Sequence, residues 1–125
     1  QGGIDTGESQ IQAAYRELFE EVGIKKTQVK VVQKSSHWYH YDLPEKYQPR
    51  PKSLKNFKGQ IQKWYMFKAN SELEISLLNE MPQEFVEYKW STYWHALASV
   101  VPFKKDVYRS VLSEFLPKYI QLHND

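Results

Sequence analysis

The spacing of apolar residues predicts one helix near the N-terminus and another near the C-terminus. Residues 10–22 place apolar side chains at the i, i+3, i+4 and i+7 positions of a helix: Ile11, Ala14, Tyr15, Leu18 and Val22. Ser9 and Gln12 form a capping box before this segment, and Gly23 supplies its C-terminal stop. Helical spacing returns from about residue 104 to residue 118, which predicts the second helix.

Strands are predicted between these helices. Valines at 29, 31 and 32, the aromatic run 38–41, the alternating polar and apolar residues 60–69, and residues 88–90 all favour extended structure. Pro44, Pro49 and Pro51 exclude regular structure from residue 43 to about residue 58. This long loop is rich in basic side chains, at Lys46, Arg50, Lys52, Lys55 and Lys58. Long loops in compact domains are usually functional or disordered, so this one is either a solvated loop or a segment that steers a polyphosphate or RNA backbone.

Composition and charge narrow the possible classes of protein. A chain of 125 residues with 41% hydrophobic residues has the size of a single domain, so we expect one domain over residues 1–125. The formal charge of +2 is too small to predict general affinity for nucleic acid, although the basic loop concentrates positive charge. The absence of cysteine excludes disulfides and thiolate nucleophiles. With no apolar run of roughly 20 residues, we expect a cytoplasmic protein without membrane association.

Three glutamates on the N-terminal helix are candidates for metal binding. Successive helical residues turn by about 100°, so Glu17, Glu20 and Glu21 fall on one face, beside the apolar positions. Like charges at this spacing cost about 0.2–0.5 kcal/mol per pair, and Mg²⁺ prefers such oxygen ligands. The alternative is a solvated acidic face, partly relieved by Lys25 four residues after Glu21.

The spacing around these glutamates reproduces a known motif. The positions of Gly2, Glu8, Arg16-Glu17-Leu18, Glu20-Glu21 and Gly23-Ile24 follow the pattern GX5EX7REUXEEXGU, where U is a bulky aliphatic residue. This pattern is similar to the catalytic box of Nudix hydrolases. The resemblance implies an α/β/α sandwich with a mixed sheet and metal-dependent hydrolysis of phosphoanhydrides. It also implies that Glu8 and Arg16 brace the loop against the helix. The chain opens on Gln1 rather than Met, so we expect the N-terminal strands of such a fold to be missing.

Beyond the box, the chain resembles the bacterial RNA pyrophosphohydrolase subfamily. The runs that carry this likeness are 1–5, 59–65, 84–85, 90–94 and 100–108. The resemblance implies that Glu17, Glu20, Glu21, Glu84 and Gly2 hold Mg²⁺, with Mn²⁺ able to substitute. Glu84 is the first choice for the general base and Glu17 the second. Phe103 and Lys104 match contacts to an RNA base; Tyr41 is a further expected substrate contact, and we expect Lys52 to steer the substrate. One departure is Val86, where the subfamily commonly has Asp.

Several interpretations of function stay open. The expected activity is removal of pyrophosphate from the 5′-triphosphate end of RNA, which starts mRNA decay, and no obligate protein partner is inferred. A dinucleoside polyphosphate hydrolase would use the same box on another substrate. A non-catalytic nucleotide- or RNA-binding module would keep the fold, but such modules usually lose box carboxylates that are all present here. For individual residues, Glu84 could be an exposed loop residue, and Phe103 with Lys104 could be a core aromatic followed by a surface lysine.

Overall fold

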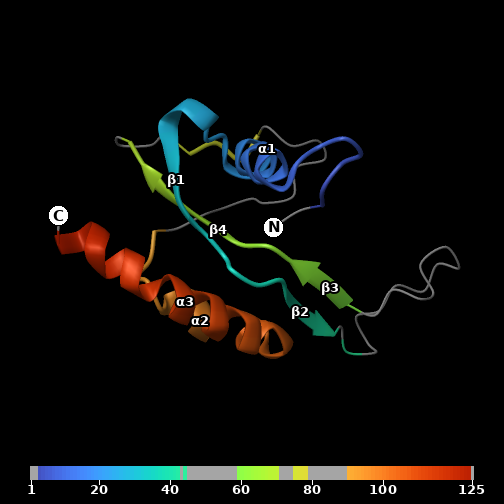
Figure 1. Ribbon diagram of the computed structural model, residues 1–125, viewed down its shortest axis with the longest axis vertical. Coiled ribbons are helices and arrows are strands. Elements are labelled where there is room, and N and C mark those ends of the chain that lie inside the picture. Colours follow the sequence, from blue (N-terminus) through green and yellow to red (C-terminus); the bar gives the residue numbers. More distant parts are fainter. Residues whose placement is uncertain (1–2, 43, 45–58, 71–74, 79–89, 125) are drawn as a thin grey trace, which may run out of the picture. The chain divides into compact units, whose positions relative to one another are not determined.

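The computed structural model describes residues 3–42, 44, 59–70, 75–78 and 90–124 (Figure 1). The chain divides into two compact units. The first unit combines Gln1–Lys34 with Tyr65–Trp90, and the second combines Ser35–Trp64 with Ser91–Asp125. The interpretation of residues 1–125 as a single domain stays a prediction.

Helix α1 (Gln10–Val22) opens the first unit and has the predicted bounds. Its capping box is present: the Gln12 N–H donates to Ser9 Oγ at 3.2 Å, and the Ser9 N–H donates to Gln12 Oε1 at 2.8 Å. The helix ends at Gly23, which adopts the left-handed φ of 75° that favours glycine and donates its N–H to the Phe19 carbonyl. Both ends of α1 are therefore fixed by residues within a few positions of the helix.

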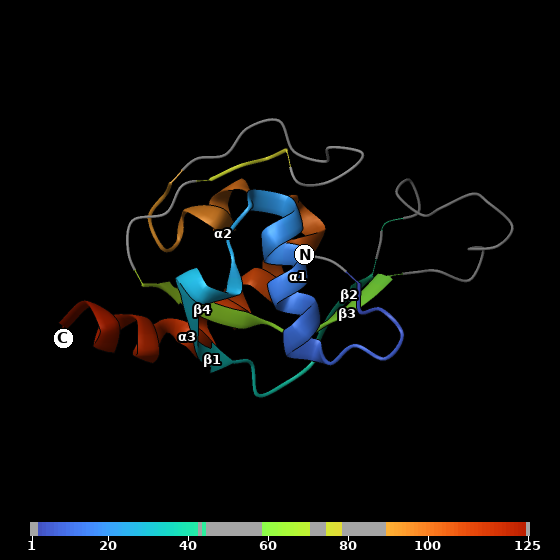
Figure 2. The ribbon, with the colours of Figure 1, turned by 90° about the horizontal axis from the view of Figure 1, so that it is seen from above.

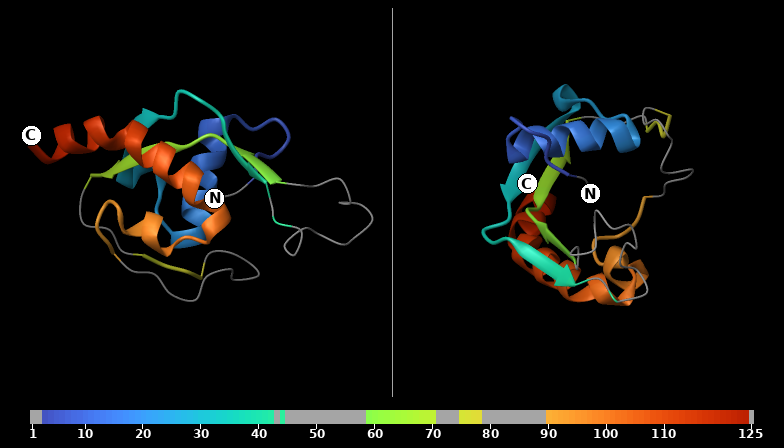
Figure 3. Two further views of the ribbon diagram at one scale, coloured as in Figure 1. Left: turned by 90° about the horizontal axis from the view of Figure 1, so that it is seen from below. Right: turned by 90° about the vertical axis from the view of Figure 1, so that its right-hand side faces the viewer.

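A 3₁₀ turn (Lys26–Gln28) leads from α1 into strand β1 (Val29–Lys34), a change of direction that Figure 2 shows. β1 pairs antiparallel with β4 (Tyr65–Ala69), with a bulge between Val31 and Gln33. The helix packs on this pair, since the rings of Tyr15 and Phe67 lie 5.2 Å apart (Figure 3). In the described part of this unit, the buried apolar residues are Ala13, Ile24 and Val29. The first unit thus places the acidic helix on a small antiparallel sheet.

The prediction of one strand over 60–69 is wrong, because Lys63 and Trp64 interrupt it. Strand β3 (Gly59–Gln62) pairs antiparallel with β2 (Tyr39–Asp42), whereas β4 pairs with β1. The backbone of Trp64 is instead bound to Ser35: its N–H donates to Ser35 Oγ at 3.0 Å and its carbonyl accepts the Ser35 N–H at 2.8 Å. A contact distant in sequence therefore ends β3 at Gln62, inside the segment that was predicted as one strand.

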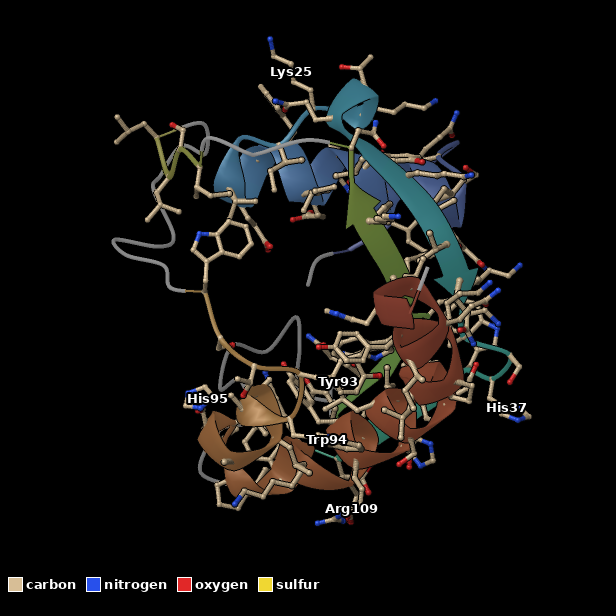
Figure 4. The ribbon with its side chains drawn as sticks, turned by 90° about the vertical axis from the view of Figure 1, so that its left-hand side faces the viewer. Lys25, His37, Tyr93, Trp94, His95 and Arg109 are labelled. Atoms are coloured by element: carbon tan, nitrogen blue, oxygen red, sulfur yellow. The ribbon has the colours of Figure 1, made fainter. Side chains whose placement is uncertain are left out.

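The second unit packs helices against the β2–β3 pair. Helix α2 (His95–Ser99), which the sequence did not predict, precedes a 3₁₀ turn (Pro102–Lys104) and the long helix α3 (Lys105–Asn124). α3 and β2 are in contact. Among the described residues of this unit, the buried apolar ones are Tyr41, Val107, Val111 and Phe115. Figure 4 shows Tyr93 turned toward α3, where its hydroxyl donates to the Leu112 carbonyl at 2.7 Å.

The remaining predictions of structure have mixed outcomes. The α/β class is confirmed, but every strand pair in the described ranges is antiparallel, so the mixed sheet stays a prediction. Residues 45–58 of the basic loop and residues 88–89 of the last predicted strand lie outside the described residues; Trp90 is described, exposed and not in a strand. None of the helices within those ranges is long and apolar enough to cross a membrane.

Candidate functional site

The loop before α1 is folded around two acidic residues. The Glu8 N–H donates to the Asp5 carbonyl at 3.0 Å, and the Asp5 N–H donates back to Glu8 Oε1 at 3.0 Å. Gly7 adopts a φ of 80°, in the left-handed region, which lets the chain turn sharply between these bonds. The loop therefore holds the Glu8 carboxylate in a defined orientation.

Arg16 binds this loop to α1. Its Nε donates to Glu8 Oε2 at 2.9 Å and its Nη2 donates to Glu8 Oε1 at 3.0 Å, which is a bidentate pair. Nη2 also donates to the Gly3 carbonyl at 2.6 Å. These bonds lower the pKa of Glu8, chiefly through the hydrogen bond from Arg16, and they raise the pKa of Arg16. The contact between Glu8 and Arg16 that the motif implied is thus present in the structure.

The third nitrogen of Arg16 reaches the acidic face of the helix. Nη1 donates to Glu17 Oε1 at 2.7 Å and to Glu20 Oε2 at 3.2 Å. Because a carboxylate has two oxygens, pairing one of them with arginine is compatible with metal ligation by the other. The side chain of Glu17 is 17% exposed and that of Glu20 is 36% exposed, so both are accessible to solvent ions. Hard oxygen donors of this kind fit a divalent cation such as Mg²⁺.

The full set of predicted metal ligands is only partly described. Glu17, Glu20 and Glu21 lie on α1 as expected, but Gly2 and Glu84 lie outside the described residues. Within the part of the chain that the structure describes, no three His, Asp or Glu side chains are gathered closely enough to hold a metal ion. The assignment of these ligands, and of Glu84 as the general base, therefore stays a prediction.

The second unit brings together three of the four predicted substrate-binding residues. The rings of Tyr41 and Phe103 lie 5.4 Å apart at an angle of 52°. Lys104 Nζ lies 5.5 Å from the centre of the Tyr41 ring and 5.9 Å from that of Phe103. Tyr41 is 7% exposed, whereas Phe103 and Lys104 are half-buried. Lys52 lies outside the described residues. We call Tyr41, Phe103 and Lys104 the aromatic cluster.

Two groups of polar side chains support this unit without having been predicted. Glu114 on α3 accepts hydrogen bonds from the Ser36 N–H at 2.7 Å and from the Tyr39 hydroxyl. Burial raises the pKa of Glu114, but the hydrogen bonds from Tyr39 and Ser36 outweigh burial and lower it; burial and the nearby carboxylate raise the pKa of Tyr39 to about 12.

The other group begins at the Tyr41 hydroxyl, which donates to Gln60 Oε1 at 2.9 Å. The sequence offered one indication of this group: Gln60 and Gln62 occupy alternate positions, which share one face of a strand. Nothing in the local sequence pointed to Glu114.

Comparison with known proteins decides the family. A family model described as the NUDIX domain matches residues 1–111. The chain belongs to the Nudix family. Nudix hydrolases depend on divalent metal ions, and membership in the family supports hydrolysis of phosphoanhydrides by this chain, as the motif predicted.

Individual relatives of this Nudix hydrolase are similar over most of its length. The chain is 43% identical over 118 residues to the RNA pyrophosphohydrolase of Pseudoalteromonas translucida. The aligned region covers 94% of the chain and 68% of that relative. It is 40% identical over 119 residues to the RNA pyrophosphohydrolase of Aliivibrio fischeri, covering 92% of the chain and 68% of the relative. The corresponding protein of Vibrio cholerae is 42% identical over 119 residues, with coverages of 92% and 67%. The predicted resemblance is thereby confirmed.

Proposed function

We propose that this Nudix hydrolase removes pyrophosphate from the 5′-triphosphate end of RNA in the cytoplasm. The observation that carries the proposal is the aromatic cluster, in which a half-buried phenylalanine ring lies beside a lysine. A base can stack on such a ring, while the ammonium group binds a polar base edge or a phosphate. The names of the relatives support the same substrate, since each is an RNA pyrophosphohydrolase.

The acidic face of α1 would perform the hydrolysis. Glu17, Glu20 and Glu21, together with Glu84 and the backbone of Gly2, would hold Mg²⁺, which neutralises phosphate charge and activates water when bound. In the proposed reaction, a water oxygen bonds to the α-phosphorus and the bond to the bridging oxygen breaks. Pyrophosphate leaves and the RNA keeps a 5′-monophosphate. Glu84 would accept the proton of the attacking water, and Glu17 is the second candidate for this role.

Arg16 supports this assignment by orienting the helix carboxylates. Its Nη1 pairs with one oxygen of Glu17 and one of Glu20, while its other two nitrogens bind Glu8 and Gly3 in the loop. The loop and the acidic face are thereby joined through one planar group. Such fixed geometry favours catalysis, because ligands that are already oriented need little reorganisation when substrate binds.

Product analysis tests the proposal. The protein is incubated with Mg²⁺ and, in separate reactions, a 5′-triphosphorylated RNA oligonucleotide or diadenosine tetraphosphate. We expect pyrophosphate and 5′-monophosphorylated RNA from the first, and no such products from a Glu21→Gln variant. Faster cleavage of the dinucleotide would make the protein a dinucleoside polyphosphate hydrolase. Tight binding of either substrate without any turnover would instead identify a non-catalytic binding module.

A further inference from the structure

A chain of hydrogen bonds runs along one face of the β2–β3 pair and ends at the aromatic cluster. Trp64 Nε1–H donates to Gln62 Oε1 at 3.0 Å, and Gln62 Nε2–H donates to Gln60 Oε1 at 3.0 Å. Gln60 Oε1 also accepts the Tyr41 hydroxyl at 2.9 Å. Gln60 and Gln62 lie two positions apart on β3 and so share a face, and Gln60 is the register partner of Tyr41.

The indole of Trp64 sets the direction of this chain. An indole N–H can only donate, whereas a glutamine amide offers an oxygen on one side and an NH₂ group on the other. The oxygen of Gln62 must therefore face Trp64, which turns its NH₂ group toward Gln60. The oxygen of Gln60 must then face Gln62, where it also accepts the proton of the Tyr41 hydroxyl. Each hydrogen bond fixes the orientation of the next amide, so the indole N–H of Trp64 determines the orientation of both the Gln62 and the Gln60 amides.

Trp64 is itself held in place, which makes it a suitable anchor. Its backbone is hydrogen-bonded on both sides to Ser35, which is fully buried. Its ring meets the ring of Tyr108 edge-on, with centroids 5.2 Å apart. An anchor with so few alternative positions can determine the orientation of the flexible glutamine side chains that follow it.

We propose that Gln62, oriented by Trp64, is a positioning residue for Tyr41. It keeps an acceptor in place beside the Tyr41 hydroxyl and thereby holds the Tyr41 ring against Phe103 and Lys104. Gln62 does this without touching the substrate. The inference rests on the proposed function, because it assigns the aromatic cluster to base binding.

A double-mutant cycle tests this role. Gln62→Met removes both polar groups at nearly constant volume, and loss of one neutral hydrogen bond should raise KM for triphosphorylated RNA by roughly three- to tenfold with little change in kcat. In a Tyr41→Phe background, the same substitution should have almost no further effect. Additive effects of the two substitutions would overturn the proposal, because a merely structural role of Gln62 would not depend on the Tyr41 hydroxyl. Gln121→Met, at an exposed position on α3, is the matched control.

A spectroscopic test separates this inference from the proposed function. The indole N–H resonance of Trp64, assigned with Trp64→Phe, should lose its hydrogen-bonded shift in Gln62→Met and keep it in Gln62→Glu, whose carboxylate still accepts. An unchanged resonance in Gln62→Met would refute the chain of hydrogen bonds whatever the substrate. If the wild-type protein does not hydrolyse triphosphorylated RNA, the proposed function fails, and the same cycle measured on the binding of ATP decides the role of Gln62.

Discussion

Replacing Phe103 by alanine should weaken the binding of RNA by roughly tenfold. Stacking of one base on an aromatic ring contributes about 1–3 kcal/mol, which corresponds to tenfold to hundredfold in affinity. The Phe103 ring is half-buried, and its contact with Tyr41 at 5.4 Å occupies part of its surface. Tyr41 and Lys104 would also remain in the variant. We therefore expect an effect near the lower end of this range.

The assay compares KM for 5′-triphosphorylated RNA with the affinity for Mg²⁺ measured by calorimetry. Phe103→Ala should raise the KM for RNA and leave the affinity for Mg²⁺ unchanged, because the ring carries no metal ligand. Phe103→Leu, which keeps an apolar side chain but no aromatic face, separates stacking from packing. An RNA KM that is the same in Phe103→Ala as in the wild type would refute the assignment of the cluster. Equal salt dependence for RNA and diadenosine tetraphosphate, together with that result, would contradict RNA as the substrate, since RNA should contact more phosphate-binding lysines and arginines.

Three further predictions concern the helix face and the polar contacts. Glu21→Gln should abolish most turnover with an unchanged circular dichroism spectrum, because a neutral amide is a poor Mg²⁺ ligand; wild-type activity would contradict it. Arg16→Lys should lower turnover and speed hydrogen exchange at the Asp5 amide, since lysine cannot form the bidentate pair with Glu8; the exposed pair of Arg109 with Asp106 provides the control Arg109→Lys. Tyr39→Phe should lower the free energy of unfolding by about 1–3 kcal/mol at neutral pH. Because the pKa of Glu114 is lowered in the folded state, its stabilisation is lost as pH falls below about 4.5, so denaturation curves of the two proteins should converge in acid.

Among the predicted elements, helix α1 is fixed by local interactions. Helix α1 has the predicted bounds because its capping box and its terminal glycine lie within a few residues of the turns that they cap. Helix α3, by contrast, continues beyond residue 118 to Asn124. Its last turns carry Tyr119 and His123, whose ring centroids lie 4.2 Å apart at an angle of 55°, and Tyr119 also packs on Tyr93. The contact between Tyr119 and Tyr93 joins residues distant in sequence, and no local sequence pattern predicts it.

The candidate site likewise contains some features that local sequence spacing predicts and others that it does not. The Nudix motif identified Glu8, Arg16 and the acidic face of α1, because fixed spacing along a loop and a helix determines their placement. The bond of Arg16 to Gly3 and its shared contact with Glu17 and Glu20 depend on side-chain orientation, which spacing alone does not set. The pairing of Tyr41 with Phe103 requires segments about sixty residues apart to meet, so only resemblance to a family could suggest it.

The electrostatics of α1 show how a stable fold accommodates a locally unfavourable helix. The helix has no acidic residue in its first turn and no basic residue in its last turn to complement the helix dipole, and Glu20 and Glu21 near its C-terminus oppose that dipole. Glu17, Glu20 and Glu21 also repel one another. The capping box at Ser9 and the left-handed Gly23 stabilise the two ends, while Arg16 places positive charge against Glu17 and Glu20. Because Arg16 pairs with one oxygen of each carboxylate, it reduces the repulsion and still leaves the acidic face suited to a divalent cation. We therefore expect the replacement of Arg16 to affect both the stability and the turnover of the protein.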